Sequence, residues 1–112
     1  MIAEILKDFG VEFTQNAFPH RGHDFTIPGE TPPLLIEVKA YRQLMGLGTV
    51  REICAALTRP GWDGILIVAS GLTKNAAHYI DQFNLTREEK IHVVTGRDKE
   101  TIKEQLSQIL KP

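Results

Sequence analysis

The spacing of apolar residues along the chain predicts four helices. An amphipathic helix repeats its apolar residues every third or fourth position, and four segments show this spacing. The predicted helices begin at Ile2, near Val50, and after the capping residues Thr73 and Asp98. Thr49 and Glu52 form a T-x-x-E capping box at the start of the second helix. Gly10 ends the first helix, and Pro60 with Gly61 ends the second.

Five segments between these helices have the pattern of strands. The predicted strands are residues 11–15, 23–27, 34–40, 64–70 and 91–95. The second and third are expected to form a hairpin across the turn PGETPP (28–33), while the continuous apolar run GILIVAS (64–70) is typical of a strand covered on both faces. The order α-β-β-β-α-β-α-β-α predicts an α/β fold with a mixed sheet and helices on both faces. Residues 1–112 are expected to form a single domain, excised from a longer protein because it opens on one helix and closes just after another.

Composition limits the classes of protein that fit. An apolar fraction of 42% with 24% charged residues is typical of a soluble globular domain. No apolar run reaches membrane-spanning length, and the start of the chain lacks the features of a signal peptide, so we expect no membrane partner. The single cysteine, Cys54, rules out an internal disulfide and fits the reducing cytoplasm. A net charge of -1 means that any nucleic-acid partner would need a local basic patch.

The third predicted strand carries charges at the end of its apolar run. Side chains alternate along a strand, so Glu37 and Lys39 share one face while Val38 points to the other. The hairpin brings Asp24 to the same end of the sheet, and two carboxylates without soft ligands suit a hard divalent ion such as Mg²⁺. Lys39 could orient or deprotonate a water molecule, or neutralise charge on a phosphate. Glu4 would add a third carboxylate if the first helix turned its polar edge toward this site.

The same residues also have interpretations that involve no functional site. Glu37 and Lys39 could form a solvated ion pair of little energetic weight, and a second acid-x-Lys triplet, Glu88 to Lys90, occurs in a polar loop. The first triplet differs in its context at the end of a buried strand. The histidines of HRGH (20–23) lack the further ligands that zinc needs, and Cys54 lies on an apolar helical stripe typical of a core residue.

The segments GHDFTI and LLIEVKAY together resemble the D…(D/E)-x-K core of the restriction endonuclease-like superfamily. The downstream segments TVREICAAL and GWDGILIVASGLTKNAAHYIDQF resemble its Mrr-type branch, so that the likeness covers about residues 1–95. This resemblance implies the superfamily's mixed-sheet fold and a Mg²⁺-dependent nuclease, with Mn²⁺ as an alternative ion.

The resemblance also implies roles for individual residues. Asp24 and Glu37 would bind the metal with the Val38 carbonyl as a third oxygen, Lys39 would be the catalytic lysine, and Glu4 an auxiliary acid. Gln43 occupies a position where polar residues often touch the site. His23, in place of the Pro or Gly common before Asp24, departs from the pattern and could be an extra ligand or disturb the turn.

The resemblance makes DNA the expected partner. The residues expected to gather near the site and contact nucleic acid are His20, Arg21, His23, Arg42, Gln43, Arg51 and Lys74. We expect an endonuclease domain that hydrolyses DNA phosphodiester bonds, acting as a homodimer or within a larger complex through flanking domains. Two alternatives remain open. One is a catalytically silent nuclease-like fold that binds nucleic acid or supports assembly, and the other is a regulatory domain whose acids bind a metal or small ligand.

Overall fold

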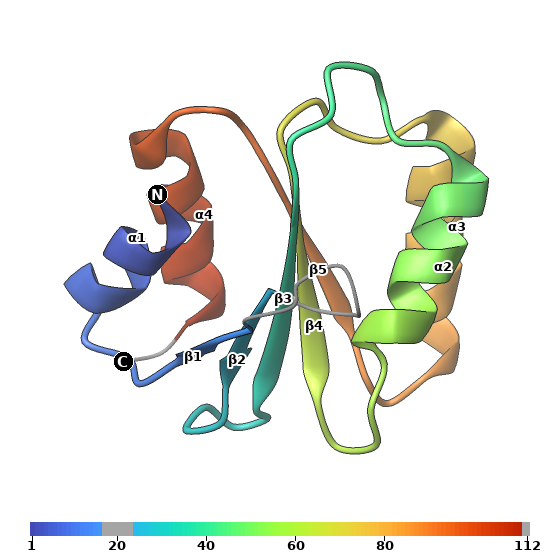
Figure 1. The fold of residues 1–112 in the computed structure, drawn as a ribbon. Coiled ribbons are helices and arrows are strands. Elements are labelled where there is room, and N and C mark those ends of the chain that lie inside the picture. The colour runs from blue at the N-terminus through green and yellow to red at the C-terminus, as the bar shows by residue number, and fades with distance from the viewer. Residues whose placement is uncertain (17–23, 111–112) are drawn as a thin grey trace.

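The computed structural model describes residues 1–16 and 24–110, and within them it contains helices on both sides of a five-stranded sheet (Figure 1). The elements are α1 (Ile2–Asp8), β1 (Thr14–Gln15), β2 (Phe25–Ile27), β3 (Leu34–Lys39), α2 (Leu47–Leu57), β4 (Asp63–Val68), α3 (Lys74–Thr86), β5 (Ile91–Thr95) and α4 (Lys99–Ile109). This order confirms the α-β-β-β-α-β-α-β-α prediction and the α/β fold class.

The strands lie in the sheet in their order along the chain, from β1 to β5. β1, β2 and β3 pair antiparallel as a meander, whereas β3, β4 and β5 run parallel. β4 alternates between two cores, because Ile65 and Ile67 pack on one face of the sheet and Leu66 and Val68 on the other. The prediction of a strand covered on both faces is therefore confirmed.

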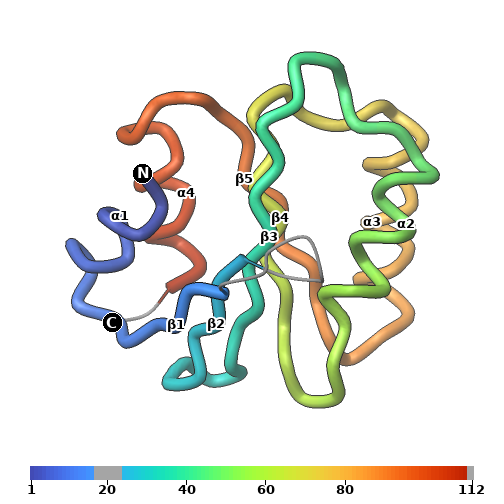
Figure 2. The backbone as a smooth tube through the Cα atoms, in the orientation of Figure 1, coloured from blue at the N-terminus to red at the C-terminus, as the bar shows by residue number. Residues whose placement is uncertain are grey.

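Two pairs of helices cover the sheet. α1 and α4 lie on one face, and α2 and α3 lie on the other (Figures 1 and 2). The first pair is joined by apolar packing and by contacts of Lys99 and Lys103 with Asp8, at 3.4 and 3.3 Å. These two ammonium groups hold the pKa of Asp8 below its ordinary value. No helix in the described part of the chain is long and apolar enough to cross a membrane.

Two of the predicted helix caps are confirmed. The Thr73 hydroxyl accepts a hydrogen bond from the Ala76 amide, and the Asp98 carboxylate accepts one from the Thr101 amide. Each side chain thus satisfies an amide that has no partner inside the first turn of its helix.

The capping-box prediction for α2 is wrong. The helix begins at Leu47 with Gly46 as its extended N-cap, so Thr49 lies inside the first turn and caps nothing. The cause is tertiary, because the preceding residue, Met45, is fixed by two backbone hydrogen bonds. Its amide donates to the Gly71 carbonyl and its carbonyl accepts from the Thr73 amide, both at 3.0 Å. The chain therefore enters the helix directly after this anchor.

Candidate functional site

Asp24 and Glu37 meet across the β2–β3 hairpin. The antiparallel register pairs Phe25 with Ile36. Asp24 immediately precedes β2, and its side chain forms a hydrogen bond with the side chain of Glu37 on β3. The structure therefore brings these two predicted metal ligands together at one end of the hairpin.

Backbone hydrogen bonds fix the position of Asp24. Its amide donates to the Ile36 carbonyl at 2.7 Å, and its carbonyl accepts from the Asn16 amide at 2.8 Å. Its carboxylate oxygen Oδ2 accepts from the Val38 amide at 2.7 Å. The backbone of β3 thus holds the Asp24 carboxylate beside Glu37, which is the preorganisation that a binding site requires.

Glu37 is the one charged residue with a buried side chain in residues 1–16 and 24–110, with 5% of its surface exposed. Burial, followed by the hydrogen bond and negative charge of Asp24, raises the pKa of Glu37 to about 8. The charge of Lys39 and a hydrogen bond from the Val38 backbone act in the opposite direction. The pair of carboxyl groups therefore retains a proton at neutral pH when no cation neutralises it.

Lys39 lies two residues after Glu37 on β3 and is half-buried. The same face of the strand carries both side chains, while Val38 packs against the core under α1 and α4. The Lys39 carbonyl accepts a hydrogen bond from the Ala69 amide at 3.1 Å, which extends the β3–β4 pairing. The acid-x-Lys triplet thus places an ammonium group close enough to Glu37 for its positive charge to lower the pKa of that carboxyl group.

Glu4 does not join the two carboxyl groups. Its side chain is 69% exposed and pairs with Lys99 of α4 at 3.5 Å. Within the described ranges, no group of three His, Cys, Asp or Glu side chains could hold a metal ion. The polar edge of α1 faces α4 rather than the hairpin, so the geometry gives no support to the predicted auxiliary acid.

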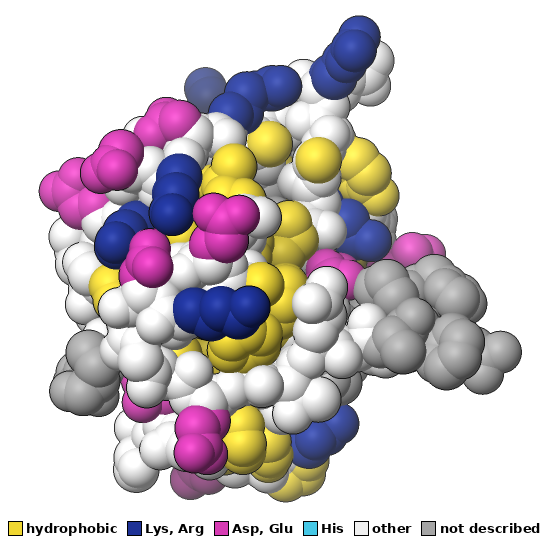
Figure 3. Space-filling model, turned by 60° about the vertical axis from the view of Figure 1, so that its left-hand side comes forward, with side chains coloured by type: hydrophobic (Ala, Val, Ile, Leu, Met, Phe, Trp, Pro, Cys, Tyr) yellow, Lys and Arg dark blue, Asp and Glu magenta, His cyan; other side chains and the backbone are white. Residues whose placement is uncertain are grey.

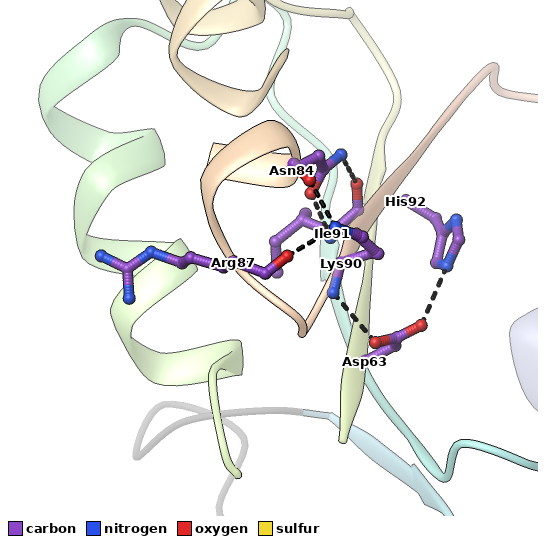
Figure 4. Close-up of polar contacts among 6 residues, drawn as sticks. All are labelled: Asp63, Asn84, Arg87, Lys90, Ile91 and His92. Carbon is purple, nitrogen blue, oxygen red and sulfur yellow. Dashed lines mark hydrogen bonds and ion pairs between the residues drawn. The ribbon is translucent and has the colours of Figure 1, made fainter. Parts of the chain in front are cut away.

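The second acid-x-Lys triplet has a structural role (Figure 4). The Lys90 ammonium donates to the carbonyls of Asn84 and Arg87, each at 2.5 Å, at the end of α3. The Lys90 amide donates to Asp63 Oδ1 at 2.9 Å, and Asp63 Oδ2 lies 3.5 Å from His92 Nε2. These contacts fix the connection between α3 and β5, and Glu88 is exposed.

The candidate nucleic-acid contacts lie beyond the carboxyl ends of the parallel strands. Arg42 and Gln43 are exposed in the loop after β3, and Lys74 is exposed at the first residue of α3. Residues 38–51 contain three cations and no acid. Figure 3 shows Lys and Arg side chains at the upper end of the molecule, where the loops after β3 and β4 lie in Figure 1. This end of the domain therefore carries local positive charge, although the net charge of the whole chain is -1.

Other candidate contacts have different outcomes. The Arg51 guanidinium lies over the Tyr79 ring, 5.6 Å from its centre, and so joins α2 to α3. His20, Arg21 and His23 lie outside the described residues, and their proposed contacts stay predictions.

Sequence reasoning missed the residues that line the approach to Asp24. A cavity of about 420 Å³ is bordered by residues 1–3, by Gln15 at the end of β1 and Asn16 after it, and by Asp24, Phe25 and Val38. β1 reaches this place because it pairs with β2, with Gln15 opposite Phe25. The signal available in the sequence was the meander itself, which sets the end of the first strand beside the start of the second.

Most of the chain matches a known protein family. The family model Mrr_cat, described as restriction endonuclease, matches residues 1–98. The chain belongs to this restriction endonuclease family. The predicted resemblance to the Mrr-type branch is confirmed, and with it the nuclease fold. No curated protein matches the sequence.

Two solved structures share the fold of this family member. The crystal structure of AF1548, a protein of unknown function, aligns with a TM-score of 0.67 and 18% identity, covering 100% of this chain and 65% of that one. MspJI restriction endonuclease in complex with a 27-mer oligonucleotide aligns with a TM-score of 0.52 and 15% identity, covering 96% of this chain and 26% of that one. The chain thus spans less than two thirds of either neighbour.

Proposed function

We propose that this domain is a metal-dependent endonuclease that hydrolyses DNA phosphodiester bonds. The observation that carries the proposal is the facing pair of Asp24 and Glu37 with Lys39 on the same strand, in a chain of the restriction endonuclease family. MspJI, which shares the fold, binds an oligonucleotide. The local positive charge of residues 38–51 supports the same class of partner.

The two carboxyl groups fit a hard divalent cation, Mg²⁺ or Mn²⁺. A buried Glu37 beside Asp24 is electrostatically costly when both are ionised, and a divalent cation held by these carboxylates would offset this repulsion. The Val38 carbonyl is proposed as a further oxygen ligand. Mg²⁺ commonly binds through only one or two protein carboxylates, so a third acid such as Glu4 is not required. When bound, the ion would supply Lewis-acid stabilisation of the charge on the phosphate.

Lys39 supplies positive charge from the protein itself. Hydrolysis requires water to attack phosphorus while the bond to the leaving deoxyribose oxygen breaks, and negative charge grows on the phosphate oxygens. An ammonium group held by β3 stabilises these oxygens and can orient the attacking water. Asp24, fixed by the Val38 amide, keeps the carboxylate end of the site in place.

A plasmid-nicking assay with a metal series tests the proposal. Wild type is expected to cut with Mg²⁺ or Mn²⁺ and to stop when the metal is chelated. Lys39→Ala and Asp24→Asn are expected to abolish cutting while remaining folded. Glu88→Gln removes an exposed acid from the second triplet and is expected to cut like wild type. Wild type that leaves DNA intact with every metal would overturn the assignment.

One observation favours a second candidate, a nuclease-like fold that binds nucleic acid without hydrolysis. The pKa of Glu37 is about 8, so this carboxyl group is mostly uncharged at neutral pH without a metal, and within residues 1–16 and 24–110 no third acidic or histidine side chain joins the pair. Salt-sensitive DNA binding without cleavage under any metal would identify this function.

A further inference from the structure

We propose that the loop of residues 40–46 stacks the Tyr41 ring on an unpaired base next to the cleaved phosphate, so that the domain prefers single-stranded or locally unpaired DNA. This inference rests on the proposed nuclease function and names its substrate class. It concerns residues that follow the acid-x-Lys triplet. Neither the family match nor the pair of carboxyl groups assigns a function to them.

Three hydrogen bonds make this loop a fixed platform. The Met45 amide and carbonyl bond to Gly71 and Thr73, both at 3.0 Å, and the Ser70 hydroxyl donates to the Gln43 carbonyl at 2.5 Å. Met45 itself is 2% exposed, so its side chain anchors the loop in the core between the sheet and α2. A loop held in this way loses little conformational entropy when it binds a ligand.

The loop exposes apolar side chains that are not buried in the core of the domain. Tyr41 is 44% exposed and Leu44 is 58% exposed, and Leu44 leans against Gly71 of the neighbouring loop. Within residues 1–16 and 24–110, Tyr41 makes no ring contact, hydrogen bond or ion pair. A cavity of about 430 Å³ opens along this loop, lined by residues 41–46 and Thr49.

Charge identifies the occupant as a nucleic acid strand. Arg42 lies between the two exposed apolar residues, and no acid occurs from residue 38 to residue 51. An aromatic ring beside a guanidinium, next to a site that handles phosphate, combines base stacking with phosphate pairing. Single-stranded nucleic acids are bound by this combination, because every base has a stacking face and every linkage carries a charge.

Position defines the substrate further. Tyr41 follows Lys39 by two residues, so their Cα atoms are separated by at most about 7 Å. A phosphate at Lys39 therefore has its neighbouring base within reach of the Tyr41 ring. In a duplex that base is paired and stacked, and its faces are covered, so an aromatic side chain can stack only on a base that has left the helix.

Binding measurements in the Lys39→Ala background separate recognition from cutting. Fluorescence anisotropy would measure the affinity for one oligonucleotide as a single strand and as a duplex, both in the presence of Mg²⁺. Tyr41→Ala is expected to weaken single-strand binding on the order of tenfold and to leave duplex binding within twofold. Tyr41→Phe keeps the ring and is expected to bind like its parent. A 2-aminopurine placed beside the expected cut is expected to lose its fluorescence quenching in Tyr41→Ala alone.

A matched control removes an exposed apolar side chain elsewhere. Leu85, 77% exposed on α3, is expected to be replaceable by Ala without effect on either substrate. Equal single-strand affinity for Tyr41→Ala and its parent, with DNA still cut by the wild type, would overturn the inference alone. Equal losses on single strand and duplex would do the same. Absence of any DNA binding by wild type and Lys39→Ala would overturn both the inference and the proposed function.

Discussion

Replacing Glu37 by Gln is expected to stabilise the metal-free protein at neutral pH. The unfolded chain ionises Glu37 at its ordinary pKa of 4.5, whereas the folded protein holds the proton until about pH 8. Gln has nearly the same size, carries no charge and can donate a hydrogen bond to Asp24. The substitution therefore removes a group whose ionisation favours the unfolded chain, at the cost of the proposed activity.

The magnitude follows from the pKa difference. Near pH 4 the carboxyl group is mostly protonated in both states and contributes almost no penalty. Between pH 4.5 and about 8 the folded state binds one proton more than the unfolded state. The free energy of unfolding therefore falls by up to about 1.4 kcal/mol per pH unit. At pH 7 we expect Glu37→Gln to exceed wild type by about 2–3 kcal/mol.

Urea unfolding in the presence of a metal chelator measures this effect at pH 4.5, 6 and 7.5. The two proteins are expected to have similar free energies of unfolding at the lowest pH and to diverge as the pH rises. Glu88→Gln alters an exposed acid, and its free energy of unfolding is expected to change with pH in the same way as that of wild type. If wild type and Glu37→Gln kept the same difference at every pH, Glu37 would already be ionised in the folded protein, and the argument from burial would be refuted.

Three further predictions address other parts of the molecule. Mg²⁺ is expected to raise the melting temperature of wild type more at pH 8 than at pH 6, because the cation competes with the Glu37 proton; Glu37→Gln should lose most of this effect in thermal melts. Burial raises the pKa of Cys54 to about 11, so a thiol reagent should label it only after urea unfolds the chain, and rapid native labelling would contradict the packing. Gly64→Ala places a Cβ 2.9 Å from Ile91 Cδ1 and 3.0 Å from Leu57 Cβ, which should cost about 1–3 kcal/mol in urea unfolding.

The sequence predicts the architecture well because its signals are local and agree with one another. The apolar periodicity identifies every helix and strand, and the caps Thr73 and Asp98 satisfy amides of their own helices. The convergence of Asp24 and Glu37 follows from a short hairpin, whose strands are adjacent in sequence and fix each other's register.

Failures occur where distant segments decide the outcome. The T-x-x-E pattern at Thr49 is a valid local signal, yet the tether of Met45 to the loop after β4 starts α2 earlier. Glu4 lies on a correctly predicted helix, but only the packing of α1 on α4 determines which way its polar edge faces. The first strand, expected over residues 11–15, is confined to Thr14–Gln15. Side-chain direction between elements is a tertiary property that periodicity alone does not contain.

The packing of α4 bears on where this family's domain should be cut for expression. The family match ends at residue 98, one position before α4 begins. Yet Ile102, Leu106 and Leu110 are buried in the same core as the side chains of α1. Removing these three side chains would lose roughly 5–9 kcal/mol of stabilisation from apolar burial. This is as much as the total free energy of unfolding of many domains of this size. A truncation at the matched boundary should therefore yield an unfolded polypeptide, and expressed fragments of related proteins should retain the helix that follows their last parallel strand.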